Sequence, residues 1–304
     1  MTFSPTELTR SLGRGLLSFP LTFFDDDGGF NEDGYRAHVA AQGTAGASGL
    51  FAAGGTGEFF SLTLEEYKRV VRAASQEVPD TMPLLAGVGY GTHMAVEFAK
   101  AAEANGADGL LVLPPYLVKS EQEGLRRHLT AICRSVGIGV IAYNRDNAVL
   151  TPETLDRLAQ DCPNLIGLKD GVGDIERMTR TYARLGDRLI YIGGLPTAET
   201  FALPLLQLGV STYSSALYNF LPEYALRFFA AVRAQDRDTV YQLLNDFIIP
   251  YLDIRDRARG YAVSIIKAGL TAVGRDGGRV RPPLTDLSPA DRADLTALID
   301  KVRA

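Results

Sequence analysis

A regular alternation of short β-rich runs and helical stretches begins near Gly15 and does more than any other feature to limit the possible folds. Such alternation is typical of βα units repeated around a parallel sheet. Eight runs fit strands: 15–23, 49–54, 83–89, 109–113, 139–143, 165–169, 189–193 and 211–215. We therefore predict an α/β fold, a closed (β/α)8 TIM barrel, whose active site lies at the C-terminal ends of the strands.

Start signals support helices between these strands. Thr63 with Glu66 forms a capping-box pattern, Thr151 precedes a proline at a first helical position, and Asp174 is a good N-cap. The competing topology, a doubly wound nucleotide-binding sheet, needs a Gly-x-Gly-x-x-Gly turn after its first strand, and the sequence has none.

The βα rhythm stops after residue 232. We therefore assign residues 1–232 to the catalytic barrel with a short N-terminal extension, and residues 233–304 to a C-terminal helical region. The apolar face of Tyr261, Val263, Ile265 and Ile266 in this region suggests a homo-oligomer, and the alternative is that it packs on its own barrel.

Composition narrows the function classes. The chain has 304 residues, 46% of them hydrophobic, and a net charge of -5 with scattered Lys and Arg, which argues against nucleic-acid partners. No apolar run reaches the length of a membrane span, and the N-terminus lacks the pattern of a signal peptide, so we expect no membrane association and a cytoplasmic location. The two cysteines, Cys133 and Cys162, fit packing positions in a reducing compartment.

A lysine at the end of the predicted sixth strand is the first candidate for chemistry. Residues 165–171 read Leu-Ile-Gly-Leu-Lys-Asp-Gly, so Lys169 arrives where a buried strand ends. Burial disfavours an ammonium ion, and a free amine attacks carbonyl carbon. Taken alone, Lys169 could equally extend its charged end to the rim of the barrel.

Residues at two other strand ends favour the catalytic interpretation of Lys169. Residues 54–58, Gly-Gly-Thr-Gly-Glu, form a turn in which successive N–H groups can bind an anion, and Tyr143 ends the fifth strand, where a phenol can shuttle protons. Considered separately, residues 54–58 could be only a tight turn and Tyr143 only a core residue. Together with Lys169, at the same end of the barrel, they are the parts needed for a Schiff base with a 2-oxo acid.

These motifs resemble those of the dihydrodipicolinate synthase and N-acetylneuraminate lyase superfamily of lysine-Schiff-base lyases. Within it, residues 52–62, 143–148, 213–220, 260–269 and 280–287 are most similar to a branch that dehydrates and decarboxylates a sugar dicarboxylate. The resemblance implies conversion of 5-dehydro-4-deoxyglucarate to 2,5-dioxopentanoate, CO2 and water, without a cofactor or metal, by a homotetramer.

The same resemblance implies roles for individual residues. Lys169 forms the Schiff base and Tyr143 relays protons. Gly55 and Thr56 hold the carboxylate next to the ketone. Gly194 and Ser214 line the pocket.

The chain also departs from the synthase pattern. Gly55 replaces a second threonine, Tyr116-Leu117 replaces a tyrosine pair, and the synthase arginine is absent because position 148 is Ala. Arg145 is a candidate for binding the far carboxylate, or else a surface charge.

His38, His93 and His128 lack metal-ligand spacing, and we interpret them as surface or packing residues. Two alternatives stay open: another 2-oxo-acid lyase or aldolase of the superfamily, and a barrel that only binds a 2-oxo acid.

Overall fold

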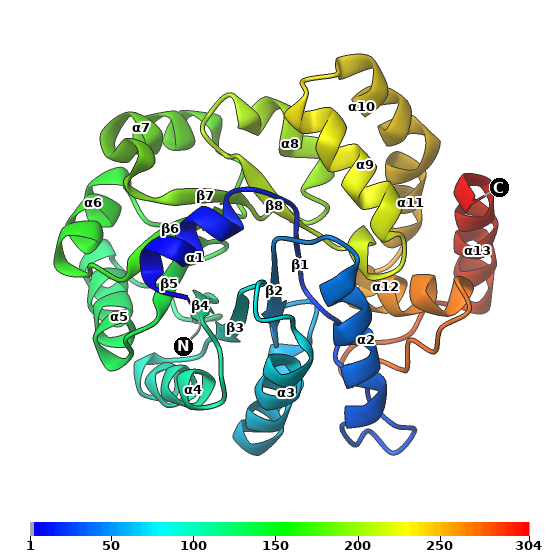
Figure 1. Cartoon of the computed structure of the whole chain (residues 1–304), viewed down its shortest axis with the longest axis horizontal. Helices are drawn as coiled ribbons and strands as arrows, with labels where there is room; N and C mark the ends of the chain where they lie inside the picture. Colours follow the sequence, from blue (N-terminus) through cyan, green and yellow to red (C-terminus); the bar gives the residue numbers. More distant parts are fainter. Residues whose placement is uncertain (1–2, 304) are drawn as a thin grey trace.

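The computed structural model describes residues 3–303 and contains a closed barrel of eight parallel strands in sequence order (Figure 1). The strands are β1 (Leu17–Ser18), β2 (Gly49–Ala52), β3 (Leu84–Val88), β4 (Gly109–Val112), β5 (Gly139–Asn144), β6 (Leu165–Asp170), β7 (Ile190–Gly193) and β8 (Thr212–Ser215). The barrel closes where Leu17 of β1 pairs with Ser214 of β8. The predicted fold class is confirmed.

Helices surround this barrel. The α-helices are α1 (Pro5–Leu12), α2 (Glu32–Thr44), α3 (Leu64–Glu77), α4 (Thr92–Ala104), α5 (Gln122–Ser135), α6 (Pro152–Asp161), α7 (Ile175–Leu185), α8 (Glu199–Leu206), α9 (Pro222–Arg233), α10 (Arg237–Leu243), α11 (Ile249–Arg255), α12 (Tyr261–Ala272) and α13 (Pro289–Arg303). Short 3-10 turns are η1 (Phe59–Ser61), η2 (Gly186–Arg188) and η3 (Leu217–Asn219), and η4 (Leu244–Ile248) is a π-helical turn.

The predicted start signals form as expected. The Thr63 hydroxyl accepts a hydrogen bond from the Glu66 N–H, and the Glu66 carboxylate accepts one from the Thr63 N–H, which completes the capping box of α3. The Asp174 carboxylate caps α7 by accepting a hydrogen bond from the Arg177 N–H. The first strand is much shorter than the predicted 15–23, because Pro20 has no N–H to donate to a neighbouring strand.

Helix α1 closes the N-terminal end of the barrel, a role that the sequence did not suggest. Leu8 and Leu12 are fully buried. The Leu8 side chain lies against Gly109 and Gly139, the first residues of β4 and β5, and a Cβ on either glycine would come within 2.8 Å of it. Figure 1 shows α1 lying across the barrel. The open end is therefore the one where the strands finish.

The C-terminal helices α10 to α13 lie together on one side of the barrel (Figure 1). Here one expectation was wrong. Tyr261, Ile265 and Ile266 of α12 are buried within their own chain, and Val263 packs against the same core. The apolar face of α12 therefore covers this chain's barrel, and it is not available to a second subunit.

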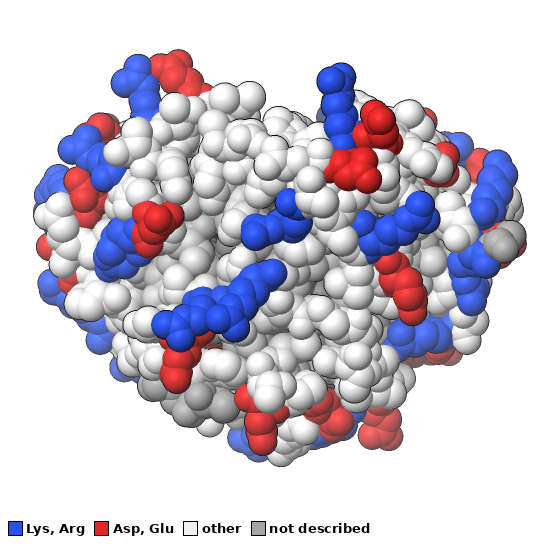
Figure 2. Space-filling model, turned by 45° about the horizontal axis from the view of Figure 1, so that its top comes forward, with Lys and Arg blue, Asp and Glu red and all other residues white. Residues whose placement is uncertain are grey.

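Charged side chains of both signs are mixed on the face seen in Figure 2, without a field of a single sign. On this face, the mixture agrees with the scattered charges of the sequence. Among residues 3–303, no helix has both the length and the apolar character needed to cross a bilayer.

Candidate active site

A cavity of about 470 Å³ lies at the C-terminal end of the barrel. All seven residues predicted to serve catalysis or binding line it: Gly55, Thr56, Tyr143, Arg145, Lys169, Gly194 and Ser214. They lie on β5, β6 and β8 or directly after β2, β5 and β7. The folding of the parallel barrel thus brings together residues that are far apart in the sequence.

Lys169 lies in the wall of this cavity and is only 5% exposed. Its Nζ atom lies 4.6 Å from the centre of the Tyr143 ring and 5.0 Å from that of Phe19. Burial lowers the pKa of the Lys169 ammonium; Tyr143 opposes this effect and the Arg145 guanidinium adds to it. The amine is thereby biased toward the neutral form that attacks a carbonyl group.

Gly194 shapes the space around this amine. A Cβ at position 194 would lie 2.6 Å from Lys169 Cγ and 3.0 Å from its Nζ, so only glycine leaves room for the lysine side chain. The Gly194 carbonyl also accepts a 2.7 Å hydrogen bond from the Tyr143 hydroxyl. Tyr143 is the strand neighbour of Lys169 in the register of β5 and β6. These contacts hold the phenol beside the amine.

The turn after β2 offers donors to an anion. Within residues 3–303, the backbone N–H groups of Gly55 and Thr56 have no hydrogen-bond acceptor. A Cβ at Gly55 would meet no atom within 4 Å, so this side of the turn faces open space. Gly54 is different, because a Cβ there would come within 2.2 Å of the Phe19 ring. The turn can therefore present two free N–H groups to a carboxylate.

Arg145 lines the cavity rather than lying on the outer surface as a free charge. Its Nη1 atom donates a 3.2 Å hydrogen bond to the Tyr143 hydroxyl, and its Nε atom lies 3.4 Å from Asp146 Oδ2. Asp170, the residue after Lys169, has a structural role. Its carboxylate accepts hydrogen bonds from the N–H groups of Val172 and Gly173 and so forms the turn after β6.

A second buried lysine escaped the sequence reasoning. The Lys267 side chain on α12 is 2% exposed, and its Nζ lies 2.8 Å from Glu58 Oε1. It also donates to the carbonyl of Arg279. Lys267 is thus an ion-pair partner of the last residue of the 54–58 turn, whereas Lys169 faces the cavity. The only sequence signal was a charged residue within an apolar helix.

The remaining candidates behave as packing or surface groups. His38 is buried and lies within hydrogen-bond distance of Asn219 and Gln42, His128 is buried beside Thr92, and His93 is exposed. Both cysteines are buried and free. Over residues 3–303, no group of three or more His, Cys, Asp or Glu side chains is placed to hold a metal ion.

Comparisons with known proteins agree with this geometry. The profile of the Dihydrodipicolinate synthetase family matches residues 13–302. A protein of Methylobacterium radiotolerans is 62% identical over 296 residues, 97% of each chain, and one of Saccharopolyspora erythraea is 60% identical over 302 residues, covering 99% of this chain and 98% of the relative. Both are named "Probable 5-dehydro-4-deoxyglucarate dehydratase".

Solved structures give the same result. The crystal structure of dihydrodipicolinate synthase from Oceanobacillus iheyensis has a TM-score of 0.89 at 25% identity over 99% of both chains. A dihydrodipicolinic acid synthase family protein of E. coli K12, solved in complex with pyruvate, has a TM-score of 0.84 at 26% identity, covering 95% of this chain and 98% of that one. With the profile match over nearly its whole length, this chain belongs to the dihydrodipicolinate synthetase family.

Proposed function

We propose that this protein is a lyase that converts 5-dehydro-4-deoxyglucarate to 2,5-dioxopentanoate, CO2 and water through a Schiff base on Lys169. The observation that carries the proposal is the buried Lys169 amine, held between aromatic rings in a cavity that also contains Tyr143 and an anion-binding turn. The choice of substrate is supported by relatives that are about 60% identical and bear this activity in their names.

The proposed binding mode uses both ends of the substrate. The N–H groups of Gly55 and Thr56 bind the C6 carboxylate, which places the adjacent C5 ketone at the Lys169 amine. Arg145 binds the C1 carboxylate at the far end, and an arginine is suited to this because its planar guanidinium can donate two parallel hydrogen bonds. Gly194 and Ser214 line the space between them.

The order of bond breaking follows from where the nitrogen can draw electrons. An iminium at C5 acidifies C4, and loss of a C4 proton gives an enamine that expels the C3 hydroxyl. The new C3=C4 double bond is conjugated to the iminium. Electrons of the C1–C2 bond can then flow to nitrogen as CO2 leaves, and the C2 enol becomes the aldehyde. Before dehydration, saturated carbons insulate C2, so dehydration must come first.

Tyr143 is the proposed proton carrier for these steps. Its hydroxyl lies between the Gly194 carbonyl and the Arg145 guanidinium, and its ring lies against the lysine amine. A phenol in this position can pass a proton between the nitrogen and the neighbouring carbons of a bound ligand.

The decisive assay is CO2 release from purified 5-dehydro-4-deoxyglucarate. Release of one CO2 per 2,5-dioxopentanoate formed would support the proposal. A lyase or aldolase of different specificity would instead condense pyruvate with an aldehyde and release no CO2 from the sugar acid. A barrel that only binds a 2-oxo acid would form the imine but turn nothing over.

We further propose that the protein is cytoplasmic and that it is a homotetramer, as the family resemblance implies. The exposed apolar residues Tyr116, Leu117 and Val118, which follow β4, support an interface between copies. A monomeric mass in sedimentation experiments at micromolar concentration would refute the tetramer.

A further inference from the structure

The C-terminal segment 279–284 contacts the turn that carries Gly55 and Thr56. Pro283 and Leu284 line the cavity, and the Arg281 backbone N–H donates a 2.9 Å hydrogen bond to Glu58 Oε2. The two partners are 223 residues apart in the sequence. A segment beyond the barrel therefore reaches the proposed carboxylate site.

Glu58 is held from two sides at the end of this turn. Its Oε1 atom pairs with Lys267 Nζ at 2.8 Å, and its Oε2 atom binds the Arg281 N–H. Its backbone has a φ of 54°, and that of Ala53 at the start of the turn has a φ of 48°. Residues other than glycine keep such a conformation only where their surroundings enforce it. For Glu58, the enforcing contacts come from α12 and the 279–284 segment.

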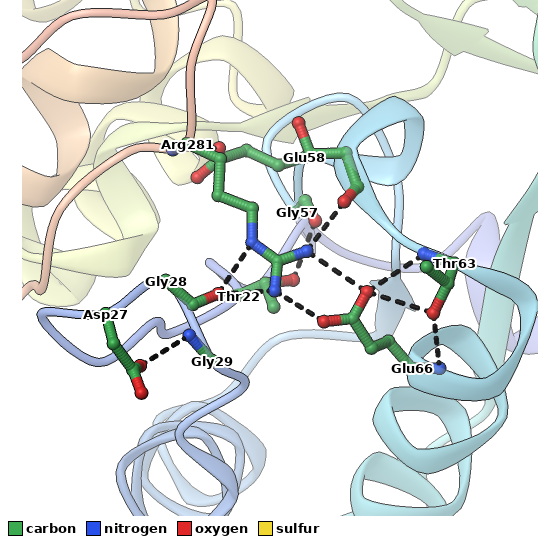
Figure 3. Close-up of polar contacts among 10 residues, drawn as sticks. Thr22, Asp27, Gly28, Gly29, Gly57, Glu58, Thr63, Glu66 and Arg281 are labelled. Carbon is green, nitrogen blue, oxygen red and sulfur yellow. Dashed lines mark hydrogen bonds and ion pairs between the residues drawn. The ribbon is translucent and has the colours of Figure 1, made fainter.

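The Arg281 side chain fastens the segment to the loop at Gly28, to η1 and to α3 (Figure 3). Its Nη1 donates a 2.6 Å hydrogen bond to the Ser61 carbonyl, its Nε donates a 3.0 Å bond to the Gly28 carbonyl, and its Nη2 pairs with Glu66. Glu66 belongs to the capping box of α3. The hydrogen bond from Arg281 is also the largest cause that lowers the pKa of Glu66, to about 2.

We infer that Arg281 is a positioning residue for the carboxylate of the 2-oxo acid. Its guanidinium anchors the 279–284 segment, the segment and Lys267 hold the Glu58 carboxylate, and Glu58 fixes the turn so that the Gly55 and Thr56 N–H groups point at the ligand. Arg281 itself does not line the cavity. The inference rests on the proposed binding of a carboxylate at this turn, but it does not depend on which sugar acid is the substrate.

The test uses pyruvate as probe, because pyruvate has the ketone and adjacent carboxylate but no far end. Borohydride trapping on Lys169 over a range of pyruvate concentrations gives the half-saturating concentration. Arg281→Ala should raise it at least about tenfold, since small misplacements of binding groups have effects of this size, with little change in the fraction trapped at saturation. The half-saturating concentration of Arg281→Lys should lie between those of the wild type and Arg281→Ala, because an ammonium group cannot span the same set of acceptors.

Arg279→Ala is the matched control. Arg279 lies in the same segment and its side chain is 72% exposed; among residues 3–303, that side chain pairs with Asp26 alone. This variant should stay within about twofold of the wild type, as is usual for isolated surface charges. If Arg281→Ala does not fold, Glu66→Gln gives a milder test, because glutamine keeps the capping bond but removes the charge that holds Arg281.

Several results would overturn the inference. It is wrong if Arg281→Ala matches Arg279→Ala, or if Arg281→Lys and Glu66→Gln both match the wild type. It is also wrong if only the long substrate loses affinity, since the segment would then act through Pro283 and Leu284. Wild-type protein that traps pyruvate but releases no CO2 from the sugar acid would contradict the proposed function alone. Wild-type protein that releases CO2 from the sugar acid but does not trap pyruvate would contradict the inference alone.

Discussion

Lys267 and Glu58 form an ion pair 2.8 Å long in which the side chains are 2% and 1% exposed. It joins α12 to the turn after β2 and gives the second buried lysine a partner of opposite charge. Both amines lie over aromatic rings, Lys267 over Phe24 and Lys169 over Phe19 and Tyr143, and burial lowers the pKa of both. The difference is that Lys169 lines the cavity at the end of the barrel. Two amines of similar burial are therefore assigned opposite roles, one structural and one nucleophilic.

The first prediction concerns this ion pair. Lys267→Met should lower the free energy of unfolding by about 3–5 kcal/mol, because Glu58 would remain buried as an unpaired charge. The double variant Lys267→Met with Glu58→Gln should lose less, since no charge is left without a partner. Urea unfolding of both variants measures the difference. A single variant as stable as the wild type would show that the pair does not matter.

The second prediction concerns pH. Burial first, and Arg145 in addition, lower the pKa of Lys169, so a free amine is present at lower pH than for an ordinary lysine. Imine formation with pyruvate should fall as pH drops through this lowered pKa. Arg145→Met removes a positive charge, so the pKa should rise and the acid limb should move to higher pH. The rate of trapping as a function of pH tests this, and an acid limb that stays in place or moves to lower pH contradicts it.

The third prediction concerns the space beside the lysine. Gly194→Ala should reduce activity by about a hundredfold or more, because its Cβ would collide with the Lys169 side chain and displace the amine. Gly91→Ala is the control, since a Cβ there meets no atom within 4 Å. Steady-state kinetics on both variants, with circular dichroism to verify folding, gives the answer. Equal activity of the two variants would rule out this role for Gly194.

The fourth prediction concerns the order of steps. An analogue of the substrate without the C3 hydroxyl should form the imine and exchange its C4 hydrogen with solvent, yet release no CO2. The reason is that C3=C4 cannot form, so the electrons of the C1–C2 bond have no path to nitrogen. NMR of the exchange and an assay of CO2 test this together. Release at a rate close to that of the true substrate would disprove dehydration before decarboxylation.

The sequence predicted the barrel and the grouping of Lys169, Tyr143 and the 54–58 turn because these depend on local patterns, whereas Gly194 and Ser214 were implied by the family resemblance. Hydrophobic runs locate strands, and parallel strands bring their C-terminal ends to one edge of the sheet, so Lys169, Tyr143 and Gly55 could be placed together without coordinates. The strand ends also differ from the predicted ends by only a few residues, apart from β1, where Pro20 ends the pairing early.

Long-range packing could not be predicted in this way. The apolar pattern of α12 identified a face that would be buried, but not the surface it packs on, and the assignment of that face to a subunit interface was wrong. The contacts of Glu58 with Lys267 and Arg281 join segments more than 200 residues apart. No periodicity or spacing in the sequence predicts such contacts, because they form only when the barrel has closed.

The most direct test of the account is borohydride reduction in the presence of 5-dehydro-4-deoxyglucarate or pyruvate, followed by peptide mass spectrometry. We predict that the mass of the reduced ligand appears on the peptide that carries Lys169, and that Lys169→Ala abolishes both labelling and CO2 release. Lys169→Arg should not restore them, because arginine remains protonated. Labelling of Lys267, or full turnover with an unlabelled Lys169 peptide, would contradict the account.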